Sequence, residues 1–226
     1  MAVDTAELGA LLLADARLPT GAFAHSSGLE PALVAGLRAD EVPAYIDGRL
    51  RTVALVEACA AVLTLRLART DPSAALRVQS ELLARMPTAP SRRASELLGR
   101  GLYRLATRLW GEHPAVTALE DLTSPPLRPI AFGVVAAALG MREDQVARAS
   151  LYDDVQTVTA AALKLLPVDP TDATGWLVAS APALEAGVAA AQQVSDDPTD
   201  LPANTAPLVE QYALDHDVRT RRIFVA

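Results

Sequence analysis

The chain has few of the residues that supply redox, metal or aromatic chemistry. Its 226 residues include one cysteine and three histidines, and aromatic residues make up only 4% of the sequence. A single cysteine, Cys59, cannot form an internal disulfide, which favours a protein of the reducing cytoplasm. No two of these four residues are spaced as metal ligands on one helical turn, so we predict no metal site. The apolar content is carried by alanine, leucine and valine, which favours packed helices over sheets.

Targeting, membrane and nucleotide-binding segments are also missing. The first 13 residues lack the basic region of a secretory signal, and no charge-free apolar run reaches the ~18 residues of a membrane span. No glycine-rich phosphate-binding motif is present, so any nucleotide would be bound by a partner. The net charge of −7 argues against a dedicated nucleic-acid-binding protein. We therefore expect a soluble cytoplasmic protein with no cofactor and with neither nucleic acid nor membrane as a partner.

Apolar residues recur at helical spacing, and no segment alternates convincingly over the length of a strand. The pattern predicts one all-α domain, residues 1–226, that is compact and contains roughly eight to ten helices. A polar linker that contains prolines is expected near 195–202. The predicted helices cover about 4–16, 27–37, 44–69, 72–86, 91–110, 130–140, 143–166, 171–180, 182–194 and 207 onward.

Two of these helices allow a sharper prediction. Residues 53–63 are apolar almost all round, so the helix that contains them should be the central buried helix. The first helix is expected to turn Leu8, Leu11, Leu12 and Ala16 toward the core.

The stretch from Leu18 to Glu30, LPTGAFAHSSGLE, differs most from the surrounding helical sequence. Pro19 and Gly21 mark a turn. Ser27, followed three residues later by Glu30, predicts a capping box at the start of a helix. These local rules leave Phe23 and His25 unexplained.

Two rival functions rest on local chemistry. His25 adjoins two serines and could belong to a small Ser/His hydrolase, although adjacent side chains seldom reach the required geometry and no nucleophile-elbow motif is present. Arg100, Arg104 and Arg108 recur at four-residue spacing and could bind phosphate or an acidic protein. A solvated face is the alternative for these arginines, because Glu96 precedes Arg100 by four residues.

The C-terminal tail, residues 216–226, combines charge with a terminal apolar cluster. Free chain ends are usually polar and poorly ordered. We therefore expect this tail to dock, either on the body of the protein or on a partner.

Four segments, in order along the chain, are similar to the urease accessory protein UreF family. Residues 18–30 resemble its signature LP-x-G-G-F-A-H-S-x-G-L-E, and residues 93–102 resemble R-x-x-S-x-x-x-G-R-x-L. Residues 129–140, with 159–167, resemble P-V-A-F-G-x-x-A-A-A-L-G and S-A-A-V-R-L-x-P. The tail resembles R-H-E-x-x-Y-S-R-L-F-R-S. The departures from the family pattern are Ala22, Asp215, Thr220, Val225 and Ala226.

The resemblance implies an all-α, dimeric adaptor without catalytic residues. Such a protein bridges the accessory protein UreD (or UreH) and the GTPase UreG, and takes part in GTP-dependent nickel delivery to apo-urease. The residues that match the family motifs are predicted to bind partners: Pro19, Gly21, Phe23, His25, Ser26, Gly28, Glu30, Arg93, Arg100, Lys164, His216, Arg222 and Phe224.

Overall fold

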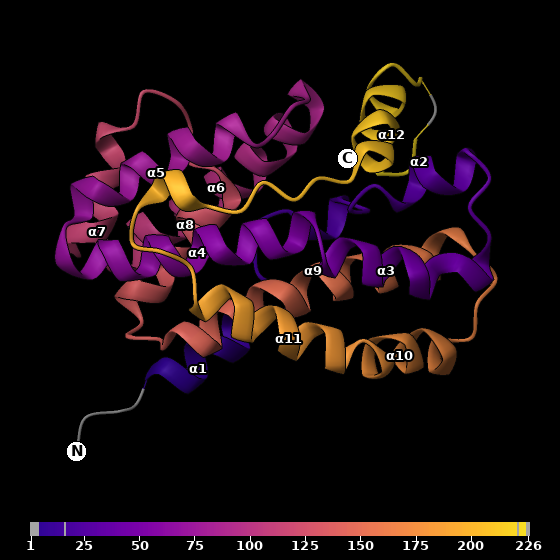
Figure 1. Ribbon diagram of the computed structural model, residues 1–226, viewed down its shortest axis with the longest axis horizontal. Coiled ribbons are helices and arrows are strands. Elements are labelled where there is room, and N and C mark those ends of the chain that lie inside the picture. Colours follow the sequence, from indigo (N-terminus) through magenta and orange to yellow (C-terminus); the bar gives the residue numbers. More distant parts are fainter. Residues whose placement is uncertain (1–4, 16, 221, 225–226) are drawn as a thin grey trace.

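A computed structural model of the chain describes residues 5–15, 17–220 and 222–224, and every regular element in these ranges is helical (Figure 1). The prediction of an all-α fold is confirmed. The α-helices are α1 (Thr5–Leu13), α2 (Leu29–Val34), α3 (Val42–Leu50), α4 (Val53–Thr70), α5 (Pro72–Ala84), α6 (Ala89–Trp110), α7 (Pro114–Thr117), α8 (Arg128–Ala138), α9 (Glu143–Leu165), α10 (Pro170–Ala179), α11 (Ala181–Gln192) and α12 (Pro207–Asp217). Short 3₁₀ helices lie at Ala22–Ala24, Ala39–Glu41, Ala118–Asp121 and Pro198–Asp200.

The described ranges thus hold twelve α-helices, slightly more than the predicted eight to ten. The single helix predicted over 44–69 is broken at Thr52, whose φ of −128° and ψ of −104° are not helical. The Thr52 hydroxyl donates to the carbonyl of Gly48 at 2.7 Å. The short α7 is the other addition, and it is capped by His113, whose Nδ1 accepts from the N–H of Ala115. Both features are local, so hydrophobic periodicity does not register them.

Helix α4 forms the centre of the core, as its apolar composition predicts. It packs against α5, α8, α9 and α11, and its residues from Ala58 to Leu65 are all buried. The crossing with α8 is close: a Cβ atom on Gly133 would lie only 2.5 Å from the carbonyl oxygen of Ala61. Glycine at this position therefore allows the two central helices to approach each other.

The buried face of α1 differs from the predicted one. Ala6, Gly9 and Leu13 are buried, whereas Leu8 and Leu11 are 61% and 72% exposed. The small Gly9 lets α1 approach Leu139 and Met141, so close packing of a small residue outweighs burial of the larger leucines. Ala16, predicted on the same face, lies outside the described residues.

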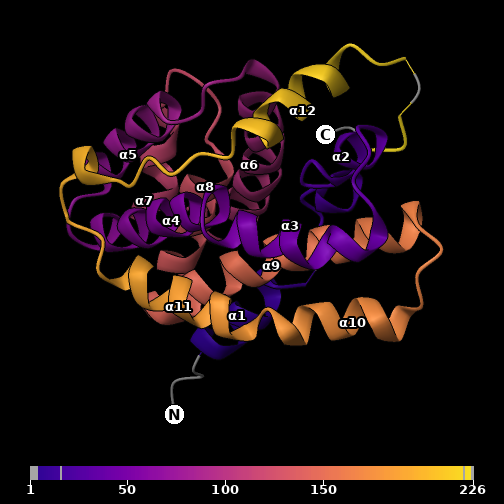
Figure 2. The same ribbon diagram turned by 45° about the vertical axis from the view of Figure 1, so that its right-hand side comes forward.

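The segment between α11 and α12 crosses the molecule over α4 and α5 (Figure 1). Arg85, the C-cap of α5, donates to the carbonyls of Thr199 and Leu201, and Arg66 of α4 donates to the carbonyl of Val194. The predicted polar linker at 195–202 is therefore bound to the body of the protein along its length. It delivers α12 to α2 and α6, and residues 222–224 lie beside α2 (Figure 1 and Figure 2).

Replacing Gly133 with alanine tests the close crossing of α4 and α8. The added methyl group would collide with the Ala61 carbonyl, so G133A should lower the free energy of unfolding by about 1–3 kcal/mol. The control is G175A in α10, where no atom lies within 4 Å of the added Cβ. There the higher helix propensity of alanine should raise stability by up to ~1 kcal/mol. Urea denaturation measures both, and equal effects would contradict the packing argument.

Candidate functional site

Residues 18–28 form a loop that contains the 3₁₀ helix Ala22–Ala24, and Leu29 and Glu30 begin α2. Gly21 and Gly28 have φ values of +91° and +78°. A Cβ on Gly28 would lie 2.8 Å from the hydroxyl of Tyr45, so both its backbone conformation and the space around it require glycine. The carbonyl of the preceding residue, Ser27, accepts from Tyr45 Oη at 2.7 Å and from Arg49 Nη1 at 3.0 Å. The loop is thereby fixed on α3.

The predicted capping box between Ser27 and Glu30 is wrong. Gly28, one residue later, is the N-cap of α2, and it provides no side-chain cap. The N–H of Glu30 donates instead to the hydroxyl of Ser26 at 3.3 Å. Because the helix starts later than predicted, Glu30 is one position too early to close a capping box, and its carboxylate is used elsewhere.

The carboxylate of Glu30 binds the C-terminal tail. Its Oε1 accepts from the N–H of Ile223 at 2.7 Å, and its Oε2 accepts from the N–H of Phe224 at 2.8 Å. His216 Nε2 lies 3.2 Å from the same Oε2. We call these three contacts the Glu30 clamp. Glu30, His216 and Phe224 are all buried, so the clamp is shielded from water and its hydrogen bonds are costly to lose.

Lys164, at the end of α9, joins the loop to the tail at a second point. Its ammonium donates to the carbonyl of Phe23 at 3.2 Å and lies 5.0 Å from the centre of the Phe224 ring, a cation–π distance. The tail therefore docks on the body of the protein, one of the two predicted possibilities. The Phe23 and Ile223 side chains remain 67% and 69% exposed. Loop and tail together thus present two large apolar side chains to solvent.

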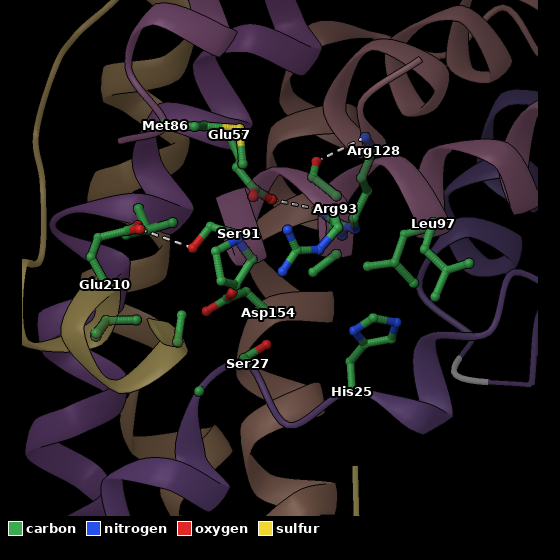
Figure 3. Close-up of a pocket in the computed structure, with 18 of the residues that line it drawn as sticks. His25, Ser27, Glu57, Met86, Ser91, Arg93, Leu97, Arg128, Asp154 and Glu210 are labelled. Carbon is green, nitrogen blue, oxygen red and sulfur yellow. Dashed lines mark hydrogen bonds and ion pairs between the residues drawn. The ribbon is translucent and has the colours of Figure 1, made fainter. Parts of the chain in front are cut away.

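A cavity of about 450 Å³ lies between this loop, α4, α6, α9 and α12. Its wall includes His25 and Ser27 from the loop, Glu57 from α4, and Arg93 and Leu97 from α6 (Figure 3). Residues His216 and Asp217 at the end of α12 also line it. The tail is thus part of the cavity wall.

Two buried arginines organise the charges of the cavity. Arg128 pairs with Glu57 at 3.0 Å and with Asp153 at 2.6 Å, while Arg49 donates to Asp154 at 3.0 Å. Burial raises the pKa of both Glu57 and Asp153, and Arg128 opposes that rise. The ion pairs offset part of the cost of placing these charges away from water.

His25 faces the same cavity. Burial, with a smaller contribution from the charge of Arg128, lowers the pKa of His25 to about 4. Its Nε2 has no hydrogen-bond partner among the described residues, so this atom does not activate a serine as the hydrolase alternative requires. Within the same ranges, no three His, Cys, Asp or Glu side chains are grouped to hold a metal ion. Among the helices in the described residues, none has the length and apolarity needed to cross a bilayer.

Comparison with known proteins decides the family. The family model described as UreF matches residues 37–181. The chain is 35% identical over 222 residues to a protein named urease accessory protein UreF from Mycobacterium sp. strain JLS, covering 96% of this chain and 97% of that protein. The proteins of the same name from Mycolicibacterium vanbaalenii and Mycobacterium tuberculosis H37Rv are 35% and 34% identical at the same coverage. The chain belongs to the UreF family.

The structure of this UreF family member brings most of the predicted site residues together. Those at the loop–tail junction are Phe23, His25, Ser26, Gly28, Glu30, Lys164, His216 and Phe224. Arg93 lies nearby and pairs with Asp217 at 2.6 Å. Pro19, Arg100 and Arg222 are exposed, and Gly21 is half-buried in the turn. Val225 and Ala226 lie outside the described residues.

Sequence reasoning missed the charged residues of the cavity. Arg49, Glu57, Arg128, Asp153 and Asp154 are distributed over α3, α4, α8 and α9. A signal was present in Glu57, the one carboxylate of the apolar helix α4, because a buried charge needs a partner. Which residue supplies that partner depends on helix packing.

Replacing Glu30 with glutamine should release the tail of this UreF family member. The amide NH₂ group cannot accept a hydrogen bond, so one of the tail N–H groups loses its partner at an expected cost of about 1–3 kcal/mol. Amide hydrogen exchange should become faster at residues 222–224. The control is E185Q, which alters an exposed carboxylate paired with Arg148. Unchanged exchange in E30Q would show that the clamp does not hold the tail.

The lowered pKa of His25 predicts a stability change between pH 6.5 and 4. In this range the unfolded chain binds a proton at His25 while the folded chain does not, so stability falls as pH falls. The loss should be about 3 kcal/mol. The raised pKa of Glu57 acts in the opposite direction, so the difference between wild type and H25Q isolates His25.

Thermal unfolding across this pH range measures the effect. H25Q should lose less stability than wild type on acidification. H113Q, which alters the half-buried histidine that caps α7, is the matched control. Parallel curves for wild type and H25Q would contradict the assignment.

Proposed function

We propose that this chain is an adaptor in the maturation of urease. It bridges a UreD- or UreH-type protein and a UreG-type GTPase, and it modulates the GTP-dependent delivery of nickel to apo-urease. Nickel is the cargo of the assembly and not a resident cofactor of the chain. The observation that carries the proposal is membership of the UreF family. The relatives that match this chain over nearly their full length are named urease accessory proteins.

The loop–tail junction supports a role in protein binding. Phe23 and Ile223 are exposed on segments that the Glu30 clamp and Lys164 hold in place. Large apolar side chains on an ordered backbone bind a partner at low entropic cost, because little further ordering is needed. We therefore propose that Phe23, Lys164 and Ile223 form one partner-binding surface.

Reconstitution tests the adaptor role. Mixed with purified UreD-type and UreG-type proteins, the chain should form a complex whose mass in solution shows both partners and the number of copies of each. A homodimer within the complex, which the family resemblance implies, stays a prediction that the same mass measures. Failure to bind either partner would contradict the proposal.

A double substitution tests the proposed surface. F23S together with I223S removes two exposed apolar side chains and should reduce nickel incorporation into urease at least about tenfold in cells that lack their own copy of the gene. The control is L8S together with V178S, which removes exposed apolar side chains from α1 and α10. The nickel content of purified urease is the measurement. Equal loss in both double variants would contradict a specific role for the junction.

A further inference from the structure

Helix α6 carries a row of exposed side chains, the first of which, Arg93, contacts the C-terminal tail through Asp217. Arg93, Leu97, Arg100, Arg104 and Arg108 follow one another at steps of three or four residues, which places them on one face of the helix. We call these five residues the basic stripe. All five are exposed, and the opposite face packs inward through Ser95, Gly99, Leu102 and Ala106. The stripe covers 16 residues of helix from Arg93 to Arg108, or about 22 Å along the helix axis.

The two ends of the stripe differ in how their charges are paired. Arg93 pairs with Asp217 of α12 at 2.6 Å, and Arg100 lies 3.6 Å from Glu96. Arg104 and Arg108 make no ion pair or hydrogen bond with any residue that the structure describes. The second half of the stripe therefore carries two positive charges that no carboxylate of the described residues pairs with.

The first half of the stripe lies at the cavity. Arg93, Leu97 and Arg100 belong to its wall, and Figure 3 shows Arg93 and Leu97 near His25. Leu97 is an exposed apolar side chain within a row of arginines. A molecule that covers the stripe would also cover this part of the cavity wall.

We propose that the basic stripe docks an acidic protein surface, with a row of carboxylates over Arg100, Arg104 and Arg108 and an apolar side chain against Leu97. This inference rests on the proposed function, because the partner is taken to be one of the proteins of the urease-maturation assembly. Charge complementarity carries the inference, because the unpaired arginines attract carboxylates of a partner. The rest of this chain, whose net charge is −7, repels an acidic partner and so confines it to the stripe. A long polyanion such as nucleic acid would extend beyond the stripe and meet that negative charge.

Because these arginines are exposed, we expect them to affect the association rate constant of a partner more than its dissociation rate constant. Charges at the rim of an interface mainly raise the association rate, and salt screens them beyond about 8 Å at physiological ionic strength. If the stripe were only a solvated face of α6, its charges would affect neither the association rate of a partner nor the salt dependence of that rate.

Charge reversal at the unpaired end provides the test. R104E together with R108E should lower the association rate constant for at least one partner about tenfold at low salt, and the difference should shrink at high salt. The control is R38E together with R51E, which changes the net charge equally at two exposed arginines on another part of the surface. The probes are purified UreD-type protein, UreG-type protein and apo-urease, immobilised one at a time, and thermal unfolding checks that each variant folds.

The outcomes separate this inference from the proposed function. If wild type binds none of the three probes, the proposed function fails. If wild type binds and R104E/R108E binds at the same rate as R38E/R51E, the stripe is not the docking surface while the adaptor role stands. A short duplex DNA serves as a fourth probe. Its retention by wild type at ~0.15 M salt, and its loss in R104E/R108E, would overturn the inference in favour of nucleic acid.

Discussion

The arrangement of the candidate site depends on one carboxylate. Glu30 accepts hydrogen bonds from Ile223 and Phe224, which lie 193 and 194 residues further along the chain. Joining segments so far apart in the sequence has an entropic cost of loop closure. The buried carboxylate recovers it by offering strong acceptors to backbone N–H groups that would otherwise lack partners. Together with the contacts of Lys164, these hydrogen bonds join the loop and the tail into one surface.

Burial of charge is the second constraint. Arg49 and Arg128 bring two positive charges into the interior, and Glu57, Asp153 and Asp154 lie against them. Such groups add little net stability, but removing one member leaves an unpaired charge at a cost of about 3–5 kcal/mol. Because the pairs join α3 to α9 and α8 to α4 and α9, they restrict how these helices can pack. The same ion pairs fix the charged side chains of the cavity wall relative to one another.

How far the sequence predicts the structure depends on whether a feature is local. The central position of α4 follows from its own composition, since a helix that is apolar all round has to be buried. The break at Thr52 is local but leaves the hydrophobic pattern unchanged, and the buried face of α1 depends on Leu139 and Met141 beside it, so periodicity alone shows neither. The meeting of loop and tail could be inferred only as a tendency of an apolar tail to dock. The sequence does not show that Glu30 is the residue that binds the tail, because Ser27 and Glu30 also fit a local capping motif.

The end of α12 connects the parts of the site. Two adjacent residues hold it from opposite sides: His216 contacts Glu30 of α2, and Asp217 pairs with Arg93 of α6. Since both residues also line the cavity, the position of α12 sets the distance between the loop–tail surface and the basic stripe. A displacement of this end of α12 would break a buried contact on one side and an exposed ion pair on the other. The buried contact costs more to lose, so α12 is fixed primarily to α2, and the pair with Arg93 is the contact that yields first.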